Sequence, residues 1–264
     1  MKAPPFPLLL AGLCLAVWPV WSWFAAGTMD GSNDYAGLLA AIAALAVVMR
    51  APAQQLLPPL NSPLLLPTAC VVLYLAASIV GVALSGRALI VAVAIAALAS
   101  AFRMGKRMDV ALLALCVLAL PLAATLQFYF GYPLRVVAGN LSVLMLRMNG
   151  LAVVREGAML AWEGQLISID APCSGLKMLW AGLLLACALA ASARLSAWRT
   201  LGAVGMAAIV VVLANAVRAA ALFYMETGLL KLPAWAHSGL GVVCFVGAAV
   251  AILAGMHTLK GRTA

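Results

Sequence analysis

The stretch Ile169–Leu179, IDAPCSGLKML, places Cys173 between a proline and a Ser-Gly pair, where a polar segment gives way to a long apolar run. Two other chemically capable residues follow: Arg218 lies in LANAVRAAALFYMETG, and His237 lies in LPAWAHSGLGVVCF. A thiolate is a nucleophile, an imidazole transfers protons near neutral pH, and a guanidinium suits a developing oxyanion. If the fold brings these side chains together, they could carry out acyl transfer through a covalent acyl-enzyme.

The residues around Cys173 bear on its reactivity. A cysteine attacks as its thiolate, so its pKa must fall from the ordinary value of about 8.5. Pro172 suits the first turn of a helix and Asp170 suits its cap, so Cys173 would lie at a helix N-terminus. Lys177, four residues on, would add positive charge on the same face. Asp170 acts in the opposite direction unless the helix amides occupy its carboxylate.

The remaining polar residues fit complementary roles. His237 would act as general acid towards a leaving amine and then as base for the incoming nucleophile. Asn215, three residues before Arg218 and on the same helix face, would orient the guanidinium or donate to the same oxyanion. Ser174 and Gly175 would let the backbone approach closely at the turn.

The composition identifies an integral membrane protein. The chain is 67% hydrophobic and 9% charged, whereas a soluble domain is about half apolar and about a quarter charged. A water-soluble core of this size cannot bury that much Leu, Ala and Val. The formal charge of +9 therefore indicates basic cytoplasmic loops, and no binding to nucleic acid is expected.

The other five cysteines are interpreted as small packing residues of apolar segments. They are Cys14, Cys70, Cys116, Cys187 and Cys244. They form no CxxC pair and show no spacing typical of metal ligands, so neither a metal nor a cofactor is expected.

A membrane span needs about 20 apolar residues, and on that measure we predict an all-α polytopic membrane protein with about eight transmembrane helices. The candidate spans are 7–27, 35–50, 63–85, 87–103, 109–129, 173–193, 200–224 and 236–257. The first resembles a signal peptide, but it continues into Trp18–Phe24 without a clean cleavage site, so we expect it to be retained. One membrane domain, 1–264, would then comprise five N-terminal spans (1–129), an extracytoplasmic segment (130–172) and three catalytic spans (173–264).

The charged loops predict the orientation, with both termini in the cytoplasm. The loops FRMGKRMD and ARLSAWRT are the most basic and would face the cytoplasm, as the positive-inside rule requires. All but one of the acidic residues then fall outside, the exception being Asp109.

The segment 130–172 differs from the other loops. YPLRVVAGNLSVLMLRMNG has apolar residues at helical spacing with Arg135 and Arg147 among them, which suits a helix at the outer interface. LAVVREGAMLAWEGQLISID contains Arg155 and has β-branched residues on either side of Gly157 and Gly164, which predicts short strands or a hairpin.

In this topology the three chemically capable residues share one level of the membrane. Arg218 lies about 27 Å along its helix from Thr200, near the outer leaflet, at 1.5 Å per residue. Cys173 opens the sixth span and His237 the eighth, both at the outer face. Taken singly, such a cysteine is usually filler, such a histidine an interfacial anchor and such an arginine a snorkelling residue. A common level favours a shared site without proving contact.

The ordered motifs APCSGLKML, NAVR and AHSG on the last three spans resemble the exosortase/archaeosortase family. The preceding YPLR and the strand-like segment before the cysteine resemble it too, and the similarity extends over about residues 130–245. This resemblance implies a multi-pass cysteine transpeptidase or endopeptidase of the cytoplasmic membrane. Its nucleophile, arginine and histidine would be Cys173, Arg218 and His237.

The resemblance also implies the partners, which are exported proteins with a C-terminal sorting signal. Such a signal comprises a short motif such as Pro-Glu-Pro, a transmembrane helix and a basic tail. We hypothesise that Arg135, Arg147 or Arg155 pairs with an acidic residue of the motif. From the residues alone, two other classes stay open. One is a small-molecule or lipid transporter with an Arg/His binding site and an inert cysteine; the other is a structural assembly subunit.

Overall fold

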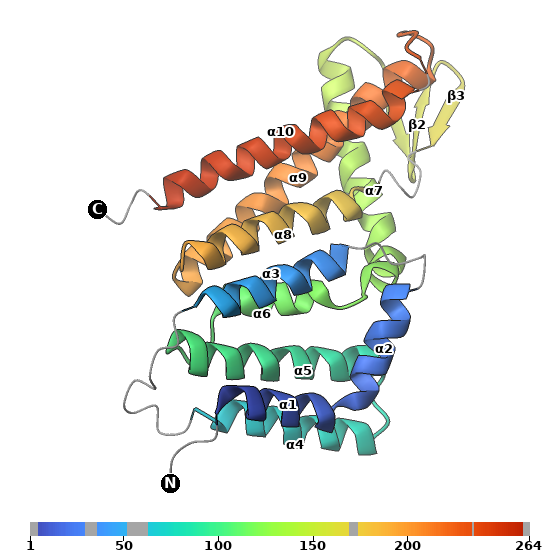
Figure 1. Ribbon diagram of the computed structural model, residues 1–264. Coiled ribbons are helices and arrows are strands. Elements are labelled where there is room, and N and C mark those ends of the chain that lie inside the picture. The colour runs from blue at the N-terminus through green and yellow to red at the C-terminus, as the bar shows by residue number, and fades with distance from the viewer. Residues whose placement is uncertain (1–4, 30–35, 52–62, 169–173, 234, 261–264) are drawn as a thin grey trace. The chain divides into compact units, whose positions relative to one another are not determined.

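The computed structural model describes residues 5–29, 36–51, 63–168, 174–233 and 235–260. Its elements divide into two compact units, 1–122 with 187–201 and 123–186 with 202–264, so that α8 and α9 contribute to both. In chain order the elements are α1 (Phe6–Ala16), α2 (Trp18–Met29), α3 (Ala36–Arg50), α4 (Leu65–Ile79), α5 (Leu84–Ala99), the π-helix η1 (Ser100–Met104), α6 (Val110–Ala119), α7 (Ala123–Met148), β1 (Val154–Glu156), β2 (Met159–Trp162), β3 (Gln165–Ser168), α8 (Leu176–Ser192), α9 (Ala197–Glu226) and α10 (Trp235–Lys260) (Figure 1).

The first unit is built around α5, which packs against α1, α2, α4 and α6, while α3 packs against α6. The buried face of α5 is rich in alanine, including Ala88, Ala92 and Ala96. Small side chains allow helix backbones to approach closely in a membrane, where dispersion contacts replace the hydrophobic driving force. Leu112 and Leu115 of α6 complete this core.

Two of the predicted spans are broken helices. Within 7–27, the axes of α1 and α2 differ by 78° at a break next to Val17, close to Pro19. Within 109–129, α6 ends at Ala119 and α7 begins at Ala123. Pro121 lies in that gap, and its lack of an N–H prevents a continuous helix. Each of these two predicted spans is therefore formed by two helices and not by one continuous helix.

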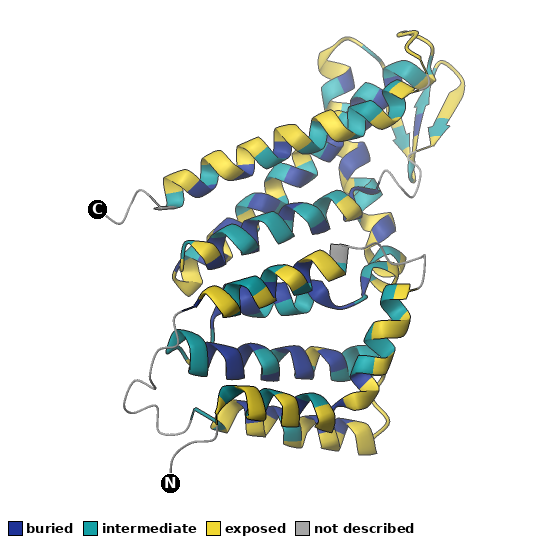
Figure 2. Cartoon of the chain, viewed as in Figure 1, coloured by how far each residue is buried: buried dark blue, intermediate teal, exposed yellow. Residues whose placement is uncertain are grey.

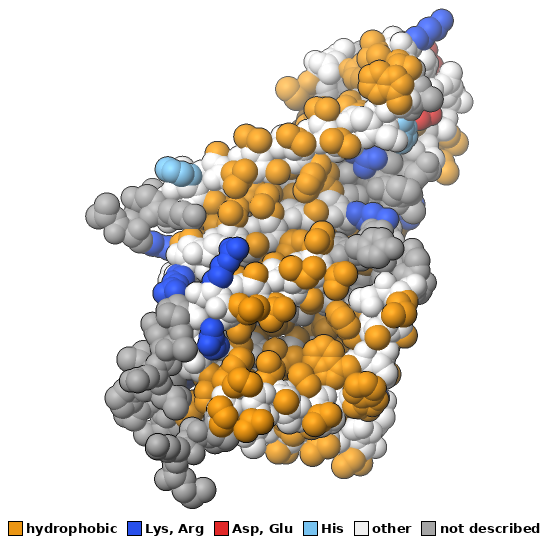
Figure 3. All heavy atoms as spheres, in the orientation of Figure 1, with side chains coloured by type: hydrophobic (Ala, Val, Ile, Leu, Met, Phe, Trp, Pro, Cys, Tyr) orange, Lys and Arg blue, Asp and Glu red, His pale blue; other side chains and the backbone are white. Residues whose placement is uncertain are grey.

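The outward faces of the helices are apolar. Figure 2 shows many exposed residues along α3, α4 and α10, and Figure 3 shows that hydrophobic side chains cover this face of the molecule. Exposed hydrophobic residues of this kind include Leu39, Val72 and Val243. Within the described residues, three helices are long and apolar enough to cross a membrane, or five if each bent pair is one span. Such faces need lipid against them, so the chain is a mainly α-helical, multi-pass membrane protein.

The second unit carries the sheet. β1, β2 and β3 form an antiparallel meander in that order, with Leu160 opposite both Arg155 and Ile167. Gly157 has a positive φ in the first tight turn, and both Glu163 and Gly164 have one in the second. Where the sequence predicted short strands or a hairpin, the structure has three strands.

The sheet is fixed to the ends of α7 and α9 by its own apolar core. Leu160, Phe223 and Leu146 are buried together, and the Trp162 ring meets Phe223 edge-on at 5.8 Å between centroids. The helix expected at the outer interface over 132–150 corresponds to the larger part of α7, which begins at Ala123 and continues through Pro133. Residue 130, where the extracytoplasmic segment was expected to begin, falls within α7, and this division of the chain stays a prediction.

Candidate functional site

The Cys-Ser-Gly motif leads directly into α8. Cys173 and Asp170 lie outside the described residues, and the description resumes at Ser174. Gly175 has φ +80°, a left-handed conformation that favours glycine, and α8 begins only at Leu176. The predicted span 173–193 therefore starts three residues too early, because the glycine conformation separates the motif from the regular helix.

Ser174 and Gly175 are fixed by buried polar contacts. The Ser174 hydroxyl donates to Oε1 of Gln127 on α7 at 3.1 Å. A Cβ added at Gly175 would lie 2.6 Å from the side-chain amide of Asn215 on α9. Only a glycine leaves room for that amide, which is 3% exposed. The turn after Cys173 is thus packed directly onto α9, whereas Lys177 is exposed.

The Asn215 level of α9 is also tied to α7. The Ser142 hydroxyl lies 2.9 Å from the carbonyl oxygen of Ala216 and 2.7 Å from that of Ala138 in its own helix. A polar contact between two apolar helices fixes their rotation about their axes. If the contact were lost, a polar group would be left without a hydrogen-bond partner in a low-dielectric environment. The face of α9 that carries Asn215 is therefore held towards the Cys-Ser-Gly turn.

Arg218 lies one turn beyond Asn215 and extends over α10. A Cβ added at Gly241 would lie 3.3 Å from Nε of Arg218. The guanidinium therefore packs against α10 at a glycine, where no side chain separates it from the helix backbone. That Nε is buried and has no hydrogen-bond partner within the described residues. A buried guanidinium N–H without a partner is costly and suits a group that meets an incoming anion.

His237 lies in the first turn of α10, one helical turn before Gly241 and hence on the same face. Its Nδ1 is 3.6 Å from Oε1 of Glu226, the last residue of α9. The two side chains are 45% and 54% exposed, so this contact orients the ring more than it stabilises the fold. Nε2 is then the ring nitrogen left for proton transfer.

A cavity of about 270 Å³ opens beside His237 and Glu226. Gln165–Ser168 of β3 and Phe223 of α9 also line it. In the described sheet β3 is paired only to β2, so its outer edge is available for pairing with an extended chain. The cavity thus combines an imidazole, a carboxylate and a strand edge.

The three other arginines singled out in the sequence each have local partners. Arg135 donates to the Gly131 carbonyl and lies over the Tyr132 ring. Nε of Arg147 donates to the Val153 carbonyl at 2.9 Å, which fixes the connection between α7 and β1.

Arg155 on β1 lies 2.6 Å from Oδ1 of Asn140 and 2.6 Å from the Gly157 carbonyl. These bonds secure the sheet to α7. The contacts of Arg135, Arg147 and Arg155 do not test whether these residues bind substrate, and that role stays a prediction.

Sequence reasoning missed Gln127, Glu226 and Gly241 as parts of the site. Glu226 served only as a marker of orientation, although it ends the same segment that carries Arg218. Gly241 follows the AHSG motif by two residues, and Gln127 lies in a different predicted span. Their roles depend on helix rotation and pairing, which one sequence does not specify.

The fold and these contacts define a class: a multi-pass membrane protein with a polar, partly buried site where α8, α9 and α10 approach one another in the second unit. The comparison with protein families is more specific. A family model described as transmembrane exosortase matches residues 23–254. The chain therefore belongs to the transmembrane exosortase family, whose members are membrane proteases or transpeptidases that act on proteins with sorting signals. No curated protein and no solved structure matches the chain significantly.

Proposed function

We propose that the protein is a membrane-embedded cysteine endopeptidase or transpeptidase that removes the C-terminal sorting signals of exported proteins. The observation that carries this proposal is the convergence of three motifs. The turn that follows Cys173 packs on Asn215, Arg218 lies one turn further along α9, and its guanidinium rests on the face of α10 that carries His237. The family membership supplies the reaction class.

In the proposed reaction the Cys173 thiolate attacks the carbonyl carbon of the scissile bond. A C–S bond forms, the carbonyl electron pair moves to oxygen, and Arg218 holds that oxyanion. His237, as imidazolium, gives a proton to the amide nitrogen, the C–N bond breaks, and the signal leaves as an amine. Water or a second amine then attacks the thioester, His237 takes its proton, and the thiolate is released.

The substrate would approach along the edge of β3. An extended segment paired to that strand would run through the cavity beside His237, and the backbone hydrogen bonds would hold it independently of most side chains. Arg135, Arg147 and Arg155 lie on α7 and β1 of the same unit. They remain our candidates for an acidic residue of the recognition motif.

We place the protein in the cytoplasmic membrane with both termini inside and the site at the outer face. Within the described residues up to five spans are found when each bent pair is taken as one. The eight crossings that we propose would also require the shorter apolar helices α3, α4 and α8 to cross the membrane. A substrate held by one transmembrane helix would then present its outer juxtamembrane segment to the site.

The decisive experiment is mass spectrometry of C-terminal peptides from cells that produce the wild type, Cys173→Ala or Cys244→Ala. Cys244 is the matched control, because it is the cysteine of α10, one turn beyond Gly241. We expect substrates to keep their helix and basic tail only in Cys173→Ala. Unchanged processing in Cys173→Ala, at equal expression, would refute the proposal. If processing were lost only in Cys244→Ala, the nucleophile would be Cys244 and not Cys173.

A further inference from the structure

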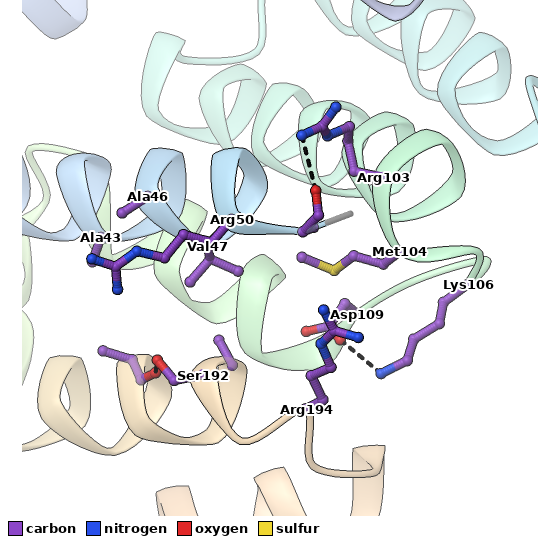
Figure 4. A pocket seen from close by; sticks show the side chains of 13 residues that line it. Ala43, Ala46, Val47, Arg50, Arg103, Met104, Lys106, Asp109, Ser192 and Arg194 are labelled. Carbon is purple, nitrogen blue, oxygen red and sulfur yellow. Dashed lines mark hydrogen bonds and ion pairs between the residues drawn. The ribbon is translucent and has the colours of Figure 1, made fainter. Parts of the chain in front are cut away.

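A second cavity lies in the first unit. It has a volume of about 390 Å³, within the range of small-molecule sites. The end of α3, the turn between η1 and α6, and the end of α8 line it (Figure 4). Its charged residues are Arg50, Arg103, Lys106, Arg194 and one acidic residue, Asp109. We call it the basic cavity.

Two of the cations build the walls of the basic cavity. Arg103 donates from Nε to the Val48 carbonyl and from Nη2 to the Ala51 carbonyl, which satisfies the C-terminal end of α3. Lys106 forms a 3.0 Å ion pair with Asp109, whose carboxylate also caps α6. Asp109 is thus already occupied and would not repel an anion strongly.

The other two cations are available. Within the described part of the chain, no hydrogen bond or ion pair is found for the side chains of Arg50 and Arg194. Arg194 has φ +51°, and its N–H and that of Leu195 close the end of α8 onto Ala191 and Ala190. Glycine usually holds this position. An arginine there is strained, and strain of this kind points to function.

One side of the basic cavity is apolar. Ala43 and Val47 of α3 and Ala188 of α8 contribute to it. The same helix α3 exposes Ile42 and Leu45 on its outer face, where lipid must cover them. Lys and Arg side chains gather at this end of the unit's helices (Figure 3). A ligand with an anionic head and an apolar tail matches both parts.

We propose that the basic cavity binds the phosphate headgroup of an anionic phospholipid. Arg50 and Arg194 line different parts of the cavity, and each guanidinium can donate to phosphate oxygens (Figure 4). Basic pockets between membrane helices are suited to such headgroups. The acyl chains would lie along α3. This site is distinct from the proposed peptidase site and does not depend on its chemistry.

The test is native mass spectrometry of the purified full chain in detergent, titrated with phosphatidylglycerol or phosphatidylcholine. We expect phosphatidylglycerol to bind more tightly, and Arg194→Gly to weaken that binding about fivefold, with a larger loss when Arg50→Gln is added. The melting temperature of Arg194→Gly should not fall, because glycine suits φ +51°. Phosphatidylcholine binding should stay unchanged.

The matched control is Arg107→Gln, which removes an equal charge from the turn between η1 and α6. Arg107 is exposed and does not line the cavity. This variant should bind phosphatidylglycerol like the wild type. Equal loss in the control, or wild-type binding by the double variant, would overturn the proposal. If inorganic phosphate displaces the lipid at matching concentrations, the ligand is a soluble phosphate, and the assignment to a lipid is wrong.

Discussion

Gly175 shows how single residues determine the geometry of the candidate site. Gly175 has a positive φ and lies close to Asn215. The side-chain amide of Asn215 occupies the space that a Cβ at this position would need. The sequence predicted close backbone approach at this residue but not the partner, because the partner belongs to a helix 40 residues further along the chain. Residue types can be read from one sequence, whereas contacts between distant residues cannot.

We expect Gly175→Ala to abolish most processing, because both the backbone conformation and the Asn215 contact must change. Gly150→Ala is the matched control, since Gly150 also has a positive φ, +83°, but open space around its Cβ position. In both variants an alanine must adopt a positive φ, which destabilises the folded state by about 1 kcal/mol. Cleavage of a reporter substrate at equal protein levels measures the difference, and equal defects would mean that the Asn215 contact is unimportant.

Glu226 is expected to position His237. Removing the carboxylate with Glu226→Gln should lower the cleavage rate several-fold, because an exposed pair at this distance contributes about 0.2–1 kcal/mol and also orients the ring. Glu226→Asp should retain part of the activity. Glu156→Gln, an exposed carboxylate on β1, should leave the rate unchanged. A rate equal to wild type in Glu226→Gln would remove Glu226 from the site.

At the scale of elements, hydropathy predicted where helices occur but not where they break. The segments around Val17 and Pro121 are apolar throughout, so a window of about 20 residues averages across each break. The start of α8 was misplaced for a related reason: Gly175 adopts a conformation that sequence alone does not specify. The strands were partly predictable, since β-branched residues flank two glycines, but their number depended on pairing.

The sheet should be able to unfold locally without destabilising the membrane-spanning helices. Trp162→Ala removes the edge-on contact with Phe223 and should cost about 1–3 kcal/mol of local stability, because Trp162 is only partly buried. Limited proteolysis should then cleave within 150–168, while the helical spans stay protected. Val154→Ala, a change at an exposed residue of β1, should leave proteolysis unchanged. Cleavage that spreads into the helices would contradict this picture.

At the scale of the whole molecule, composition alone predicted the membrane class, and the motif order predicted the family that the comparison then showed. The orientation of the chain in the membrane stays a prediction. It rests on the basic loops and the positive-inside rule.

Orientation can be measured by labelling single cysteines introduced into a cysteine-free chain. We expect Gly150→Cys to react with an impermeant reagent applied outside, since it would lie at the outer face. Arg107→Cys should react only after the membrane is opened. The reverse pattern would invert the topology and place the candidate site in the cytoplasm.

The contact between Gly175 and Asn215 has a consequence for the history of the chain. Two short motifs that lie far apart in the sequence share one small volume, so neither can enlarge unless the other shrinks. In relatives that keep the same geometry, these two positions should therefore change together, and a bulkier residue in the first motif should accompany a smaller one in the second. Paired substitution at these two sites would be the evolutionary trace of that shared volume.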